Sequence, residues 1–297
     1  MIKKKILILG VTGMLGHILF TYLSKKKNFN VYGTCSKNSN FLLKKNSFLK
    51  KLNKNIFLTH DDLFGSSLNI IKDFRPNYII NCIGVIKQSS LIDDLPHTLL
   101  INSIFPKFLS TNSNIYNYKL ILISTDCVYD GKKGYYKERD IPNSNDLYGL
   151  SKLNGEITDN KNVLTIRTSI IGPEIKTYKG LFSWLISQKR SVFGYKKVFF
   201  SGLTTLHLSQ VIEKILIHPK NISGLYNISA KKISKYDLLN KIIKIYKLNL
   251  KIFPKLSPVL DRSLNSIRFK KKLNISIETW DQMIKNQKDY YQDLSQK

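Results

Sequence analysis

The sequence predicts an α/β fold, with a doubly wound parallel sheet followed by a smaller C-terminal lobe. Two observations support this fold class. The apolar run Ile6 to Leu9 has the character of a strand buried on both faces, and it leads directly into a glycine-rich turn. Strand-like and helix-like segments then alternate up to about residue 170, as in doubly wound sheets.

The glycine-rich turn carries the spacing G-x-x-G-x-x-G, formed by Gly10, Gly13 and Gly16. Gly10 suits a tight turn, Gly13 lets the backbone approach a phosphate, and Gly16 lets the next helix pack closely on the strand. A helix that begins near Thr12 or Gly13 would direct its unpaired N–H groups at a dinucleotide diphosphate. The stretch therefore predicts a Rossmann-type nucleotide site at the start of the chain.

Composition limits the function classes. The formal net charge is +28, but the cations are 42 Lys and 6 Arg spread along all 297 residues, and Ala230 is the single alanine. We interpret this skew as a compositional bias and predict no nucleic-acid binding, although a basic pocket would suit a diphosphate.

The cysteines and the hydropathy favour a cytoplasmic protein. Cys35, Cys82 and Cys127 are too few and too widely spaced for a disulfide framework or a zinc site, so we predict no metal. Ile6 to Leu9 is shorter than the roughly 7–15 residues of a signal-peptide core. No apolar run approaches the ~20 residues of a membrane span, so no membrane insertion is expected.

The second predicted strand, Asn30 to Thr34, follows a helix over Met14 to Leu23 and ends in Cys35-Ser36-Lys37. Sites selective for NAD tend to place Asp or Glu here for the adenosine ribose. Because no acid is present, Ser36 and Lys37 are candidates to bind a 2′-phosphate. An ordinary polar strand exit explains them equally well.

The next strands also end in polar or small residues. Asn55 to Thr59 leads into Asp61 and Asp62 before a helix over Leu63 to Phe74. Asn77 to Cys82 leads into Gly84, whose missing side chain permits close approach of a ligand. A helix after Pro96, with Asn102 inside it, precedes a strand over Lys119 to Ser124.

Tyr148 and Lys152 follow this fifth strand and are four residues apart, so on a helix they share one face. A lysine beside a tyrosine favours the phenolate, and we expect Lys152 to lower the pKa of Tyr148 and make it a usable proton donor. Thr125 at the strand end could hold a substrate carbonyl against the tyrosine. The pair is informative because it follows a glycine turn and a Ser-Thr strand end.

Past Thr168 the alternation loosens. We predict helices over Leu181 to Gln188, Leu206 to Ile217 and Ser234 to Tyr246, with Ser234 as the N-cap, and strands over Lys197 to Phe200 and Leu225 to Ile228. The predicted domains are therefore 1–170 for the nucleotide and 171–297 mainly for a substrate-binding lobe, with some segments returning to the first domain.

Several motifs resemble the extended short-chain dehydrogenases/reductases, and within them the dTDP-4-dehydrorhamnose reductase family of sugar-nucleotide reductases. The motifs are Gly10 to Gly16, Ser124 to Gly131, Tyr148 to Glu156 and Arg167 to Gly172, with weaker similarity over Asp261 to Phe269. The resemblance implies NADPH as cofactor, with NADH as the alternative, and a nucleotide-sugar substrate. It also implies reduction of the 4-keto group of a deoxysugar for cell-surface polysaccharide. A homodimer is compatible with the family.

The resemblance assigns roles to individual residues. Thr125, Tyr148 and Lys152 become the catalytic triad, in which Tyr148 donates a proton to the sugar C4 oxygen and Lys152 also binds the nicotinamide ribose. Asp126 and Cys127 adjoin the substrate. The residues expected at the cofactor are Gly10, Thr12, Gly13, Met14, Leu15, Gly16, Ser36, Lys37, Asp61, Asp62, Cys82, Gly84, Ser124, Tyr148 and Lys152.

Two arginines and one cysteine leave alternatives open. Arg262 and Arg268 are candidates to bind the nucleotide diphosphate, or they form ordinary ion pairs. Cys127 stands where dehydratases of this fold carry a glutamate base, which argues against dehydration. The thiol is either a packing group or, as in the GDP-fucose synthase family, an epimerisation acid/base. A non-catalytic subunit resembling the regulatory subunit of methionine adenosyltransferase is a further alternative, against which the intact triad argues.

Overall fold

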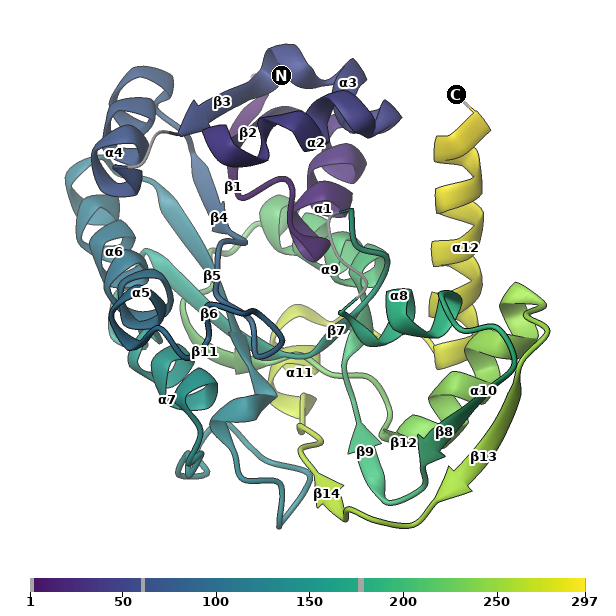
Figure 1. Cartoon of the computed structure of the whole chain (residues 1–297). Coiled ribbons are helices and arrows are strands. Elements are labelled where there is room, and N and C mark those ends of the chain that lie inside the picture. The colour runs from purple at the N-terminus through teal and green to yellow at the C-terminus, as the bar shows by residue number, and fades with distance from the viewer. Residues whose placement is uncertain (1–2, 60–61, 176–178, 297) are drawn as a thin grey trace.

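Parallel strands build the centre of the molecule. The computed structural model describes residues 3–59, 62–175 and 179–296, and within these ranges seven strands form one parallel sheet in the order β11-β6-β5-β4-β1-β2-β3 (Figure 1). This confirms the predicted doubly wound sheet. The strands are β1 Lys4–Leu9, β2 Phe29–Ser36, β3 Ile56–Thr59, β4 Tyr78–Asn81, β5 Lys119–Thr125, β6 Val163–Thr168 and β11 Gly224–Asn227.

Both faces of the sheet are covered, which explains why its strands are apolar throughout. In β1, Ile6 and Ile8 join one hydrophobic cluster, and Leu7 and Leu9 join the cluster on the opposite face. The first cluster includes side chains of α1 Met14–Ser24, α9 Thr205–Ile217 and α12 Trp280–Gln296; the second includes those of α4 Leu63–Phe74 and α6 Phe105–Ile115.

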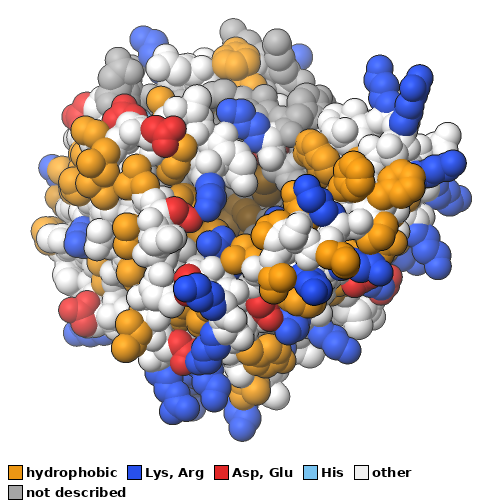
Figure 2. Space-filling view, turned by 60° about the horizontal axis from the view of Figure 1, so that its bottom comes forward, with side chains coloured by type: hydrophobic (Ala, Val, Ile, Leu, Met, Phe, Trp, Pro, Cys, Tyr) orange, Lys and Arg blue, Asp and Glu red, His pale blue; other side chains and the backbone are white. Residues whose placement is uncertain are grey.

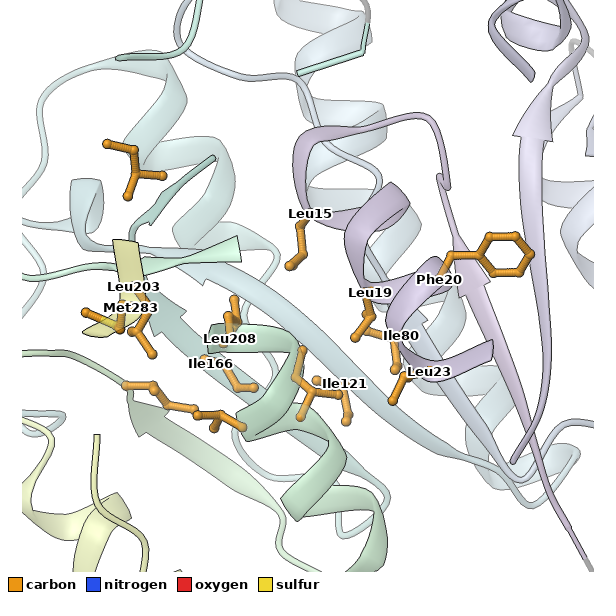
Figure 3. Close-up of a cluster of buried hydrophobic side chains, with 14 of the residues drawn as sticks. Leu15, Leu19, Phe20, Leu23, Ile80, Ile121, Ile166, Leu203, Leu208 and Met283 are labelled. Carbon is orange, nitrogen blue, oxygen red and sulfur yellow. The ribbon is translucent and has the colours of Figure 1, made fainter. Parts of the chain in front are cut away.

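Helix α1 is fixed to the sheet by a four-residue repeat. Leu15, Leu19 and Leu23 lie on one face of the helix and belong to the same buried cluster as Ile121 of β5 and Leu208 of α9 (Figure 3). All five side chains are 5% exposed or less. Deleting one such leucine side chain costs about 2–5 kcal/mol of folding free energy, so the helix that follows the glycine turn is held firmly.

The chain after residue 168 builds a smaller lobe and then returns to the sheet. Among the described residues, short strands form three small sheets: β7 Ile170–Ile171 with β10 Leu203–Thr204; β9 Val198–Phe200 with β12 Ile233–Ser234 and β14 Leu260–Asp261; and β8 Ser191–Tyr195 with β13 Lys251–Lys255. Between these segments, β11 joins the central sheet beside β6, and α9 packs beside α1. The division at residue 170 itself stays a prediction.

The remaining helices complete the fold: α2 Asn40–Lys45, α3 Ser47–Lys51, α5 Leu95–Leu99, α7 Leu147–Asn154, α8 Leu181–Ile186, α10 Lys235–Tyr246 and α11 Ile267–Leu273. The predicted N-cap Ser234 is confirmed, since its hydroxyl accepts a hydrogen bond from the Asp237 N–H. In the described ranges no helix is long and apolar enough to cross a membrane.

Sequence reasoning treated the segment after Pro96 too simply. It expected one helix, whereas α5 passes through a π-helical turn, Leu100–Ile104, into α6. Asn102 lies in that turn and is 1% exposed. Helices α2 and α3 and the parallel pair β8–β13 were not predicted.

Candidate active site

The glycine turn lies where the strand order reverses, between β1 and its neighbours β2 and β4. Gly10 adopts φ +82°, a left-handed conformation that favours glycine. A Cβ on Gly16 would lie 2.1 Å from the Gly10 carbonyl oxygen, so any side chain there would separate helix from strand. Both roles predicted from the sequence, tight turn and close packing, are confirmed.

The start of α1 is suited to an anion. Gly13 is its N-cap, makes no side-chain capping hydrogen bond, and no acidic residue lies in the first turn. A Cβ on Gly13 would lie 3.4 Å from the Gly10 carbonyl oxygen and 3.9 Å from that of Cys82, so the backbone of the turn and of the segment after β4 comes close to Gly13. The N–H groups and positive dipole end of α1 therefore fit a dinucleotide diphosphate. Thr12 and Met14 are half-buried beside this turn, and Leu15 is buried in the core.

The predicted ribose-binding residues lie at the neighbouring strand ends. Ser36, the last residue of β2, and Lys37, which follows it, are exposed, and β2 pairs with β1. Asp62 follows β3, and its carboxylate accepts a hydrogen bond from the Gly65 N–H as the N-cap of α4. Asp61 lies outside the described residues. Capping already occupies the Asp62 carboxylate, which weakens its candidacy as a cofactor ligand.

Lys152 extends from α7 towards the ends of β4 and β5. Its ammonium donates a hydrogen bond to the Ile123 carbonyl oxygen at 2.7 Å and lies 4.0 Å from the place a Gly84 Cβ would take. Burial lowers the pKa of Lys152 to about 8, although Glu156 and Cys82 act in the opposite direction. The predicted residues Lys152, Cys82 and Gly84 are thus brought together.

Tyr148 lies one turn before Lys152 on α7, and its hydroxyl interacts with Thr125 at the end of β5. The expected effect of Lys152 on this phenol is wrong. Burial raises the pKa of Tyr148, the Thr125 hydrogen bond opposes this only in part, and the Lys152 ammonium is directed at the Ile123 carbonyl. The buried phenol therefore keeps its proton at neutral pH.

Thr125, Asp126 and Cys127 lie at the carboxyl end of β5 with Arg262 beside them. The Thr125 hydroxyl accepts from the Cys127 N–H at 3.1 Å and contacts the Asp126 carboxylate at 3.3 Å. Arg262 Nη1 approaches Cys127 Sγ at 3.7 Å, and its Nε donates to the Tyr129 carbonyl at 2.8 Å. Figure 2 shows a hollow on this side of the molecule with Lys and Arg side chains around it.

The Ser124 side chain forms its hydrogen bond inside the protein. Its hydroxyl donates to Glu156 at 2.6 Å, and Glu156 also forms a salt bridge with Arg167 whose side chains are only 4% and 3% exposed. Arg167 in turn donates to the Tyr129 hydroxyl at 2.7 Å. This network joins β5 and β6 to the segment just after α7, and Glu156 is close enough to affect the pKa of Lys152. The Ser124 hydroxyl is therefore engaged within the fold, a role that sequence reasoning did not predict.

Arg268 requires a correction. It was predicted with Arg262 to bind the diphosphate, but its guanidinium donates to the Leu225 carbonyl and lies 4.4 Å from the Tyr226 ring. There it lines a groove of about 530 Å³ with Gly224, at the amino edge of the parallel sheet. Thr125 and Lys152 lie at the carboxyl edge, so Arg262 and Arg268 do not share a site.

A comparison with protein families shows which family this chain belongs to. The sequence model of the RmlD substrate binding domain family matches residues 4–287, almost the whole chain. The chain belongs to this family. The crystal structure of dTDP-4-dehydrorhamnose reductase from Bacillus anthracis in complex with NADP superimposes with a TM-score of 0.77 at 20% identity, covering 96% of this chain and 98% of that one. It supports the Rossmann-like fold.

Curated relatives of this RmlD-family chain carry two different names. The dTDP-4-dehydrorhamnose reductase of Aggregatibacter actinomycetemcomitans is 27% identical over 190 residues, which is 61% of this chain and 64% of that protein. Methionine adenosyltransferase 2 subunit beta of Bos taurus is 27% identical over 178 residues, 59% of this chain and 49% of that protein. In both cases the chain covers less than two thirds of the relative's length.

Two cations of this family member were missed from the sequence. Lys235, the first residue of α10, is half-buried near Asp126 and Cys127, with Arg262 and Lys87 also close enough to affect its pKa, which burial lowers. Lys87 donates to Asp146, the N-cap of α7, at 2.7 Å. Both are ordinary lysines in a lysine-rich sequence, and no local motif distinguishes them. Among the described residues, no group of His, Cys, Asp and Glu is arranged to hold a metal ion.

Proposed function

We propose that this chain is an NAD(P)H-dependent reductase that acts on the 4-keto group of a nucleotide-activated deoxysugar. The observation that carries the proposal is the convergence of three features at one edge of the sheet: the uncapped glycine turn, the Lys152 ammonium beside Gly84, and Tyr148 in contact with Thr125. The names of the reductase relatives add support.

Tyr148 is the proton donor in this proposal. Burial raises the pKa of its phenol, so the hydroxyl is protonated when a carbonyl oxygen arrives and can transfer its proton as that oxygen gains negative charge. The Thr125 hydroxyl, which lies against the Tyr148 side chain, orients the same oxygen. Without substrate this hydroxyl donates to the Asp126 carboxylate at 3.3 Å, so it must turn away from Asp126 to donate to the carbonyl oxygen.

Lys152 has a binding role in this proposal. With a pKa of about 8, it carries a positive charge near neutral pH, and its position beside Gly84 lets it bind a ribose hydroxyl of the cofactor. When bound, a reduced nicotinamide supplies the hydride.

NADPH is the proposed cofactor. The Gly10-to-Gly16 turn and the first N–H groups of α1 receive the diphosphate. Ser36 and Lys37 stand exposed at the end of β2, and no Asp or Glu adjoins them in the sequence, which suits a 2′-phosphate better than a bare ribose. NADH remains the alternative cofactor.

The substrate's anionic part is assigned to Arg262, Lys235 and Lys87. These three cations lie around Asp126 and Cys127 at the end of β5, where two come from the C-terminal half of the chain and one from the loop after β4. Guanidinium and ammonium groups match phosphate oxygens. A nucleotide diphosphate in this position would place the attached sugar beside Tyr148.

The decisive experiment is a screen of dTDP- and UDP-linked 4-keto sugars with NADPH, read by the loss of absorbance at the nicotinamide band. Oxidation that depends on the sugar nucleotide and is lost in Tyr148→Phe supports the reductase. A protein that binds NADPH but oxidises it with none of these sugars would instead favour a regulatory subunit, as the similarity to methionine adenosyltransferase 2 subunit beta suggests. We propose that the wider role of this reaction is to supply a deoxysugar for cell-surface polysaccharide.

A further inference from the structure

The C-terminal helix α12 contacts the glycine turn through one histidine. His17 lies on α1, four residues after Gly13 and 274 residues before Tyr291 of α12. Its ring Nδ1 is 2.8 Å from the Gly13 carbonyl oxygen, and its Nε2 is 2.6 Å from the Tyr291 hydroxyl. The His17 side chain is 2% exposed, so these two contacts are shielded from water.

The chemistry of the partners fixes the direction of both hydrogen bonds. A carbonyl oxygen only accepts, so His17 Nδ1 carries the proton towards Gly13. Burial lowers the pKa of His17 to about 4, and the ring is neutral at pH 7, so Nε2 accepts from the Tyr291 hydroxyl. Burial also raises the pKa of Tyr291 well above its ordinary value, so this hydroxyl keeps its proton.

The Gly13 carbonyl matters because it belongs to the peptide unit that opens α1. It accepts from the His17 backbone N–H at 3.1 Å as well as from the imidazole. A peptide unit is planar, so fixing the Gly13 carbonyl also fixes the Met14 N–H, which lies in the same plane and points in the opposite direction. Met14 is the first residue of α1, and its N–H is among those without a helical acceptor.

Helix α12 is well enough packed to serve as a support. Leu294 forms a buried cluster with Ile18 of α1 and Leu206 of α9, and Tyr290 packs edge-on against Tyr22. The Tyr291 hydroxyl therefore contacts His17 from a helix that is packed against its neighbours on both sides of that contact.

We propose that Tyr291, acting through His17, positions the Gly13–Met14 peptide for binding of the dinucleotide diphosphate, so that the last helix of the chain contributes to cofactor affinity. Tyr291 and His17 are positioning residues, because neither is placed to touch the cofactor's reacting atoms. The inference rests on the proposed function of the glycine turn as a dinucleotide site.

Tyr291→Phe tests the proposal, because it removes one hydroxyl and keeps the ring. NADPH binding is measured by titration of the nicotinamide fluorescence, and the dissociation constant should rise about tenfold, the effect of one lost buried hydrogen bond. The matched control is Tyr290→Phe, whose hydroxyl makes a long contact with the Thr21 hydroxyl at 3.4 Å; its dissociation constant for NADPH should stay within about twofold of wild type. Saturating NADPH should restore kcat in Tyr291→Phe.

A second pair of variants tests the route through His17. His17→Asn keeps an amide donor near the Gly13 carbonyl but is too short to reach Tyr291, so in this background Tyr291→Phe should have no further effect on NADPH affinity. Nitrogen-15 shifts of His17 should show the Nδ1–H tautomer in wild type and in Tyr291→Phe, because the Gly13 carbonyl requires that proton in both, while the Nε2 shift should change in Tyr291→Phe as its hydrogen bond is lost. If Tyr291→Phe does not fold, the two His17 variants still test the contact with the Gly13 carbonyl. Weaker NADPH binding by His17→Leu than by His17→Asn would support it.

The outcomes separate the two proposals. Wild-type protein that binds neither NADPH nor NADH overturns both the cofactor site and this inference. Wild-type protein that binds NADPH, with Tyr291→Phe equal to it, overturns the inference alone. If Tyr291→Phe weakens NADPH binding by the same factor in wild-type protein and in His17→Asn, the route through His17 is overturned.

Discussion

The Arg262 guanidinium lies beside the Cys127 thiol, with Nη1 3.7 Å from Sγ across 135 residues of sequence. A cation at that distance lowers the pKa of a thiol, as at reactive cysteines. Here burial and the neighbouring Asp126 carboxylate raise it more, and the pKa of Cys127 is about 12. The thiol is therefore protonated near neutral pH, which favours a packing role over an acid/base role.

Cys127→Ser should accordingly keep most of the turnover, with at most a modest loss of stability from burying a hydroxyl. The measurement is turnover in heavy water, with product analysed by mass spectrometry. Deuterium that enters C3 or C5 of the sugar only when Cys127 is present, beyond spontaneous exchange, would show that the enzyme also epimerises.

Tyr148→Phe should abolish most turnover and leave NADPH affinity nearly unchanged. The substitution removes the proton donor and keeps the ring that packs beside Thr125. Loss of a positioned acid reduces the rate by roughly 10²–10⁴-fold. Steady-state kinetics together with a binding titration check the prediction, and a variant with more than half of the wild-type kcat would remove Tyr148 from the mechanism.

The pKa of Lys152 predicts a pH dependence of cofactor binding. A lysine is charged below its pKa, so raising the pH through about 8 removes the charge, and NADPH affinity should fall between pH 7 and pH 9.5. Lys152→Met should bind NADPH more weakly at pH 7, turn over more slowly, and lack this pH dependence. The same affinity loss at high pH in the methionine variant would assign it to another group.

The two arginines provide a matched pair. Arg262→Lys should raise KM for a sugar nucleotide, because a lysine cannot keep the Tyr129 carbonyl contact and still present a forked donor to phosphate. Arg268→Lys, at the opposite edge of the sheet, should leave KM within about twofold of wild type, the scatter usual for remote surface changes. Equal effects of the two substitutions on KM would contradict the placement of the substrate.

Glu156→Gln should destabilise the fold. It leaves the buried Arg167 guanidinium without its carboxylate, and breaking a buried pair on one side costs roughly 3–5 kcal/mol. Urea unfolding followed by circular dichroism measures the change. The control is Asp93→Asn at an exposed position, where a change within about 0.5 kcal/mol is expected. A Glu156→Gln variant as stable as this control would show that the network contributes little.

Several features of the site could be predicted from the sequence because local geometry governs them. Gly10 and Gly16 sit where a strand turns into a helix; the positive φ of Gly10 favours glycine, and the 2.1 Å approach at Gly16 leaves no space for a Cβ. Tyr148 and Lys152 share a helix face because they are four residues apart. A continuous apolar strand such as Ile6 to Leu9 predicts a sheet covered on both faces.

Other features depended on contacts between distant segments. Arg262 and Lys235 reach Cys127, and Tyr291 reaches His17, through turns and helices whose relative positions no local pattern encodes. Arg268 shares the residue type and neighbourhood of Arg262 in the sequence, yet it lies at the opposite edge of the sheet because α11 packs against the start of β11.

The Tyr148 phenol shows most clearly which properties follow from the local sequence and which from the tertiary structure. The sequence by itself determined that Tyr148 and Lys152 lie on one helix face after a Ser-Thr strand end, because helical periodicity acts over a few residues. Only the tertiary structure decided the direction of the Tyr148 pKa shift. That direction depends on how much water the surrounding segments exclude and on where the Lys152 ammonium finds its acceptor, and both are properties of the packed whole.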